Sequence, residues 1–179
     1  GILTVAMEFI EPMPHILLAG GGHCAQAIAD ASASLSWSIS VLDIRPEYAS
    51  VELWPDAQER IVMKPEEFLS GETVESLSRF SHIMLLGHDW AIDETLLIGL
   101  LQRSEGRPRI GCIGSRSKWK AFEKSAIDAG ISQKLIDSVI CPIGVNIGAE
   151  SPQEIAIAVL AQIIADVKGV EPGAPNWRD

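Results

Sequence analysis

The chain is poor in cysteine, and the cysteines that it has do not form a motif. Cys24, Cys112 and Cys141 are the 3 cysteines among 179 residues, and no two of them have the C-x-x-C spacing of a zinc or redox motif. An odd number of widely separated cysteines argues against a disulfide framework or a zinc site. It indicates reduced thiols, as expected of a cytoplasmic protein.

Basic residues and long apolar runs are also scarce. The 14 Lys and Arg residues are outnumbered by 24 Asp and Glu residues, which gives a net charge of −10. Nonspecific nucleic-acid binding needs a basic face, so this charge argues against a nucleic-acid partner. The sequence contains no signal peptide and no apolar run of about 18 residues, so we expect a soluble chain without a membrane partner.

The sequence lacks the commoner catalytic and metal-binding motifs as well. Neither H-E-x-x-H nor G-x-S-x-G is present, and Ser115 lies far along the chain from both His23 and His88. No nucleophile–base pair can therefore be assembled, and no metal site is predicted. We expect a site that holds a phosphorylated ligand rather than one that cuts a bond.

Strand and helix patterns alternate along the chain, which is typical of a parallel sheet covered by helices on both faces. We expect a Rossmann-like, three-layer α/β/α fold with a mostly parallel sheet, spanning residues 1–168 and followed by a loose tail over 169–179. An extra N-terminal edge strand would favour a homodimer. Strands are predicted over Ile2–Ile10 (the extra strand), His15–Ala19, Ser38–Leu42, Arg60–Met63, His82–Leu86 and Arg109–Ile113. Helices are predicted over His23–Leu35, Pro65–Ser78 (one or two), Trp90–Gln102, Ser115–Ala129 and from the capping box at Ser151 to Lys168.

The most informative motif follows the strand that ends at Ala19. Gly20-Gly21-Gly22-His23-Cys24-Ala25 has the form G-x-G-x-x-A, in which the first glycine permits a tight turn and the second lets a phosphate approach the backbone. The helix that follows would direct its free N–H groups at an anion. Asp43 ends the next strand, near the spacing at which an acidic residue meets a ribose hydroxyl.

Polar residues follow four of the predicted strands, and in a parallel sheet these strand ends lie at one edge, where ligands bind. The candidate site residues are Gly20, Gly21, Gly22, His23, Asp43, Arg45, His88, Asp89, Ser115, Arg116 and Lys118.

Several of these residues also have a purely structural interpretation. His23 could simply begin a helix, Asp89 could be an N-cap, and Arg45 could pair with Asp43 instead of with a phosphate. Residues 115–118 could merely open a surface helix. However, cations at a helix start oppose the helix dipole, which suggests that an anion joins them.

Taken in order, these clusters resemble the C-terminal domain of the XdhC/CoxI family, the accessory proteins of xanthine dehydrogenase and related molybdenum hydroxylases. The resemblance runs from about Ile2 to Lys168. The matching segments are Leu18–His23, Asp43–Glu47, His88-Asp89 with Asp93, Ile113–Lys118 and, most distinctively, Pro142–Ala156.

The resemblance implies a Rossmann domain that binds molybdenum cofactor, a phosphate-bearing pterin dithiolene, and passes it to an apo-molybdoenzyme of the xanthine dehydrogenase type. It also implies that the cofactor is held while a cysteine desulfurase adds its sulfido ligand. Family members usually carry a further N-terminal domain, which could supply ligand or partner contacts.

Two other functions fit the same residues. An NAD(P)-dependent oxidoreductase would use Gly20–Ala25 for the pyrophosphate and Asp43 for the ribose, although no second domain presents a substrate. A regulatory nucleotide sensor would need only the binding site. We expect a cofactor-binding chaperone rather than either of these.

Overall fold

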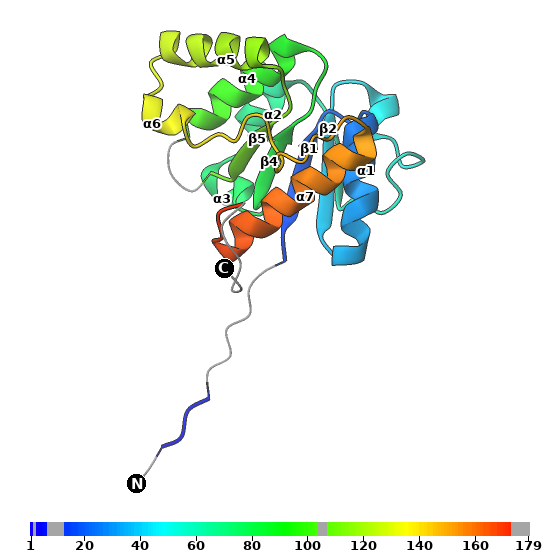
Figure 1. The fold of residues 1–179 in the computed structure, drawn as a ribbon, viewed down its shortest axis with the longest axis vertical. Helices are drawn as coiled ribbons and strands as arrows, with labels where there is room; N and C mark the ends of the chain where they lie inside the picture. The colour runs from blue at the N-terminus through cyan, green and yellow to red at the C-terminus, as the bar shows by residue number, and fades with distance from the viewer. Residues whose placement is uncertain (2, 7–12, 104–106, 173–179) are drawn as a thin grey trace.

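The computed structural model describes residues 1, 3–6, 13–103 and 107–172. A sheet of five strands, in the order β3-β2-β1-β4-β5, forms its centre, and every pair of neighbouring strands is parallel (Figure 1). The strands are β1 (His15–Ala19), β2 (Ser38–Asp43), β3 (Glu59–Val62), β4 (His82–Leu85) and β5 (Arg109–Cys112). The short, mostly apolar sequences of β1, β2 and β4 are typical of strands that are buried on both faces.

The helices fall into two groups. The longer ones are α1 (His23–Ser32), α4 (Trp90–Leu101), α5 (Arg116–Asp128) and α7 (Pro152–Lys168), and the shorter ones are α2 (Pro65–Gly71), α3 (Val74–Leu77) and α6 (Gln133–Ile136). Two 3-10 turns, η1 (Ala33–Leu35) and η2 (Pro46–Ala49), follow α1 and β2. Figure 1 shows α1 and α7 side by side on one face of the sheet.

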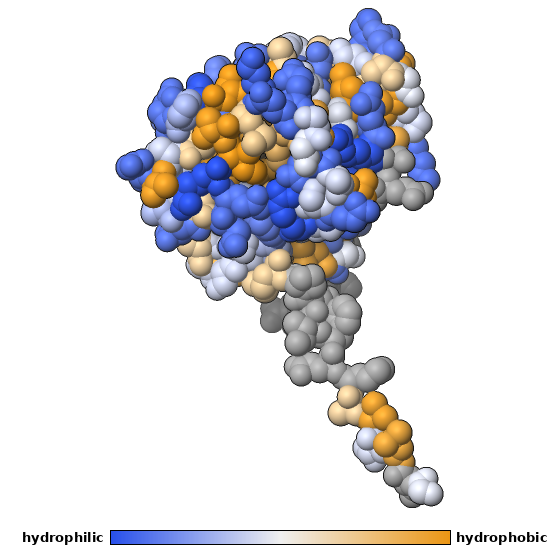
Figure 2. Space-filling view, turned by 180° about the vertical axis from the view of Figure 1, so that it is seen from behind, coloured by the Kyte–Doolittle hydropathy of each residue, from blue (hydrophilic) through white to orange (hydrophobic). Residues whose placement is uncertain are grey.

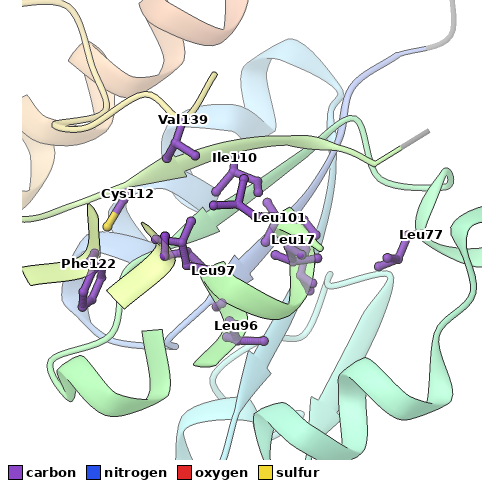
Figure 3. Packing of buried hydrophobic residues seen from close by; sticks show 14 of the residues in the cluster. Leu17, Leu77, Leu96, Leu97, Leu101, Ile110, Cys112, Phe122 and Val139 are labelled. Atoms are coloured by element: carbon purple, nitrogen blue, oxygen red, sulfur yellow. The ribbon is translucent and has the colours of Figure 1, made fainter. Parts of the chain in front are cut away.

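Alternate side chains of β1 divide the core into its two halves. Ile16 and Leu18 pack with side chains of α1 and α7, whereas Leu17 and Ala19 pack with those of α2, α4 and α5. Seen from the side opposite α7, the surface is mostly hydrophilic, with apolar side chains gathered in a hollow (Figure 2). Figure 3 shows the core cluster on that side, including Leu17, Leu97 and Phe122. This arrangement confirms the three-layer α/β/α prediction.

The predicted strands and helices from residue 15 onward are confirmed, with bounds that shift by one or two residues. The helix expected over 23–35 ends as the 3-10 turn η1, and the segment 65–78 holds two helices. Helix α6 was not predicted, and neither was the parallel bridge between Gly111 and Ile140 that involves the chain just after it.

Only parts of the predicted edge strand and of the predicted C-terminal tail lie within the described residues. Most of the expected edge strand Ile2–Ile10 lies outside the described residues, and its described part, residues 3–6, forms no strand. Residues 169–172 follow α7 without regular structure, and the rest of the expected tail lies outside the described residues. No helix in the described ranges is long and apolar enough to cross a bilayer.

Two isoleucines of α7 allow the packing of this helix to be tested with one chemical change. Ile163 is fully buried in the core, whereas Ile157 is 59% exposed. Ile163→Ala should lower the free energy of unfolding by about 2–5 kcal/mol, because it leaves a cavity. Ile157→Ala, the control, should change it by about 0.5 kcal/mol or less. Equal losses in urea denaturation would contradict the orientation of α7.

Candidate functional site

The loop between β1 and α1 brings backbone N–H groups to the carboxyl edge of the sheet. Gly20 has φ +107°, and a Cβ there would lie 2.9 Å from the backbone nitrogen of Gly87, so the two loops touch backbone to backbone. Gly22 is the N-cap of α1, and a Cβ there would meet no atom within 4 Å. The start of α1 has no side-chain cap and no acidic residue in its first turn, so its first N–H groups have no side-chain acceptor there.

Asp43, at the end of β2, is already bonded on both carboxylate oxygens. Its Oδ2 accepts hydrogen bonds from the Gly21 N–H (2.9 Å) and from Arg45 Nη2 (2.9 Å). Its Oδ1 accepts from the backbone N–H and from Nε of Arg45, both at 3.0 Å. The Arg45 guanidinium also stacks 3.6 Å from the centre of the Tyr48 ring. Arg45 therefore pairs with Asp43, one of the two alternatives that the sequence left open.

These contacts determine the charge state of Asp43. Burial alone would raise the pKa of this carboxyl, but the hydrogen bonds and charge of Arg45, with the Gly21 N–H, outweigh it. The pKa of Asp43 lies below its ordinary value, so the ionised carboxylate holds the Gly-rich loop and Arg45 in place.

Lys118 and Asp93 form a buried ion pair next to the ends of β4 and β5. Lys118 Nζ donates to Asp93 Oδ2 at 2.6 Å, and the two side chains are 5% and 1% exposed. Nζ also donates to the carbonyl oxygens of Ile113 (3.1 Å) and Gly87 (3.3 Å), and Asp93 Oδ1 accepts from the Gly87 N–H (3.2 Å). The anion that joins this cation is therefore a residue of the chain itself. Lys118 lies behind the candidate site and supports its loops.

Two adjoining hollows occupy the carboxyl edge, and they share Gly20, Arg45, Gly87 and His88. The smaller, of about 100 Å³, lies over the ends of β2 and β4 and is lined by apolar side chains of α2 and α4, with Asp43, Asp89 and Asp93. The larger, of about 490 Å³, lies beside the start of α1 and is lined by Gly22, His23, Cys24, Tyr48, Leu86 and Pro152 as well. The smaller hollow thus combines apolar side chains with three carboxylates, and the larger one reaches the start of a helix, where an anion is favoured.

The structure brings together most of the predicted site residues, but not all of them. Gly20, Gly22, His23, Asp43, Arg45, His88 and Asp89 line one hollow or both. Gly21 lies beneath the loop, where a Cβ would collide with the Tyr48 carbonyl. Asp89 is also the N-cap of α4, accepting from the Ala91 N–H at 2.9 Å. Ser115 caps α5 and Arg116 is exposed, and neither lines these hollows.

The sequence analysis did not include Tyr48 and Asp93 among the site residues. Asp93 had a detectable signal, because it is a carboxylate beside the apolar positions Ile92, Leu96 and Leu97 of one helix. Tyr48 had none, since its position depends on the 3-10 turn after β2.

Comparison with known proteins identifies the family. Residues 16–163 match the model of the XdhC Rossmann domain. The chain belongs to the XdhC family.

Two curated relatives of this XdhC-family chain are longer than it. The chain is 34% identical over 174 residues to an uncharacterized protein, YqeB, of Escherichia coli K12, in a match that covers 97% of this chain but 31% of YqeB. It is 33% identical over 167 residues to a protein of Bacillus subtilis named as a probable xanthine dehydrogenase subunit, in a match that covers 92% of this chain and 46% of the relative. A solved xanthine dehydrogenase of Bacillus halodurans shares the fold, with a TM-score of 0.74 at 23% identity over 93% of this chain and 46% of that one.

The contribution of the buried Lys118–Asp93 pair to stability can be compared with that of an exposed ion pair on the same helix, α5. Lys118→Met leaves Asp93 buried without its partner and should lower the free energy of unfolding by about 3–5 kcal/mol. Lys124→Met breaks an exposed pair with Asp128 (2.5 Å; side chains 76% and 62% exposed) and should cost about 0.5 kcal/mol or less. Urea denaturation measures both. A loss of less than about 1 kcal/mol for Lys118→Met would contradict the structural role of the pair.

The lowered pKa of Asp43 predicts a pH dependence. Asp43→Asn should cost about 1–3 kcal/mol of unfolding free energy at pH 7, because a charged acceptor is lost. The stabilisation is present above the unfolded pKa, about 3.9, and is lost as the pH falls through the lower folded pKa. The difference between wild type and variant should therefore narrow below about pH 4. A difference that stays constant down to pH 3 would contradict this, and exposed Asp30→Asn is the control.

Proposed function

We propose that this domain binds molybdenum cofactor and assists its sulfuration and its insertion into an apo-molybdoenzyme of the xanthine dehydrogenase type. The observation that carries the proposal is the uncapped, open N-terminus of α1 beside a pair of adjoining hollows. A bound phosphate is favoured at such a helix start by the free N–H groups and the helix dipole.

The residues at this edge fit the parts of such a cargo. Its phosphate suits the main-chain N–H groups at Gly22 and His23, which line the larger hollow. Its flat pterin suits the small hollow, where Ile92 and Leu96 supply apolar contact. In the described part of the chain, no group of three or more His, Cys, Asp and Glu side chains could hold a metal ion.

The surroundings of the small hollow also support a protein partner. Ile44 and Met63 line it and are 42% and 36% exposed, and Trp90, at the start of α4, is 48% exposed. Exposed apolar side chains at the mouth of a ligand site suit a surface that an acceptor enzyme covers. The name of the Bacillus subtilis relative points to xanthine dehydrogenase as the kind of acceptor.

An NAD(P)-binding oxidoreductase is the second candidate, because the Gly-rich turn and the position of Asp43 favour a dinucleotide. In this structure, however, both oxygens of Asp43 are bonded to Arg45, so a ribose hydroxyl would have to displace that side chain. This pairing favours the cofactor-binding function over the oxidoreductase.

Anaerobic calorimetric titration with molybdenum cofactor, NAD and NADP tests the proposal. Gly22→Val should weaken cofactor binding by about tenfold or more, because the side chain fills the open space above the loop. Stability should hardly change, since the backbone at Gly22 has φ −74° and ψ −171°.

Gly71→Val is the matched control, because Gly71 also has open space around its Cβ position and lies at the end of α2. It should leave cofactor affinity unchanged. Binding of NAD or NADP alone would support the oxidoreductase. Cofactor affinity that is unchanged in Gly22→Val would contradict this location of the site.

A further inference from the structure

Two of the cysteines lie opposite each other across a pair of parallel strand segments. A single parallel bridge pairs Gly111 with Ile140, and Cys112 and Cys141 are the next residues along the two segments. The flanking hydrogen bonds agree: the Cys112 N–H donates to the Ile140 carbonyl (2.9 Å), and the Cys112 carbonyl accepts from the Ile143 N–H (3.0 Å). Cys112 therefore lies alongside the Cys141-Pro142 segment, which Ile140 and Ile143 flank.

Both side chains belong to the same region of the core, because Cys141 packs against the buried cluster that contains Cys112. Cys112 is fully buried in the core cluster of Figure 3, whereas Cys141 is partly exposed. The third cysteine, Cys24, lies in α1, beside the larger hollow.

The spacing of paired strands allows a covalent bond between these thiols. Neighbouring strands lie about 4.8 Å apart, which is within the separation of about 4.4–6.8 Å that disulfide-bonded Cα atoms adopt. We propose that Cys112 and Cys141 form a reversible thiol–disulfide site that exchanges with a low-molecular-weight disulfide such as oxidised glutathione. Neither cysteine lines the two hollows, so this site does not depend on which ligand binds there.

The surroundings of the two cysteines indicate which thiol reacts first. The neighbouring Cys112 thiol and the charge of Lys118 lower the pKa of Cys141, whereas the Cys141 thiol and burial raise the pKa of Cys112. Cys141 is also the thiol that solvent reaches. It is therefore the attacking thiolate, and Cys112 is the resolving thiol.

The exchange balances in two steps. The Cys141 thiolate attacks one sulfur of glutathione disulfide, forms a mixed disulfide and releases a glutathione thiolate. Cys112 then loses its proton to that thiolate and attacks Sγ of Cys141, which breaks the mixed disulfide and releases the second glutathione. Two cysteine thiols are oxidised, and one glutathione disulfide is reduced to two thiols.

The experiment incubates the full chain with excess oxidised glutathione, quenches it in acid, unfolds it and alkylates the remaining thiols. Intact mass should show alkylation at one cysteine instead of the 3 in the reduced protein. Peptide mapping should find Cys112 joined to Cys141, and excess reduced glutathione should restore all the thiols. Three alkylated thiols, a bond to Cys24, or a glutathione adduct on Cys141 that goes no further would each overturn the proposal.

Two variants test the assignment of the pair. Cys24→Ser is the matched control and should form the same cross-link as the wild type. Cys112→Ser should stop at a single glutathione adduct on Cys141, because the resolving thiol is gone. An intramolecular disulfide that persists in Cys112→Ser would overturn the assignment. The mapping of the wild-type cross-link decides the proposal even if this core variant folds poorly.

Discussion

The buried ion pair between Lys118 and Asp93 is the interaction on which the carboxyl edge of the sheet depends. It joins α5 to α4, and through Gly87 and Ile113 it fixes the chain after β4 and after β5. The pair also explains why two nearby positions are occupied by glycine, since neither has room for a side chain. A Cβ on Gly87 would lie 2.5 Å from Asp93 Oδ1, and one on Gly114 would lie 2.9 Å from Lys118 Cδ. Gly20, which has no Cβ, passes close to the backbone of Gly87, so the Gly-rich loop rests indirectly on this ion pair.

The layered fold could be predicted from the sequence because its signals are local. Short apolar strands alternate with helices, and motifs such as the capping box at Ser151 mark where an element begins. The general place of the site could be predicted too, since parallel strands bring their carboxyl ends to one edge. The short helix α6 and the bridge at Ile140 were missed because four helical residues and a single bridge give almost no periodic signal.

The roles of the charged residues could not be predicted, because they depend on partners that are distant in sequence. Lys118 looked like part of a basic anion site, and the fold turned it toward Asp93, 25 residues away. Arg45 could have faced a phosphate, and it lies on Asp43 and Tyr48 instead. With these cations paired internally, attraction of an anion in this acidic protein rests mainly on the main-chain N–H groups at the start of α1.

The most direct test of the account is an amide NMR titration of the labelled chain with a stable, metal-free pterin that carries a phosphate monoester. We predict that the largest shift changes fall on Gly20 to Cys24 and on Gly87 and His88. The separate hollow beside β3, lined by Glu59, Phe68 and Arg79, should be unaffected. Changes concentrated in that hollow, or none at ligand concentrations of about 1 mM, would contradict the claim that the carboxyl edge binds a phosphorylated pterin.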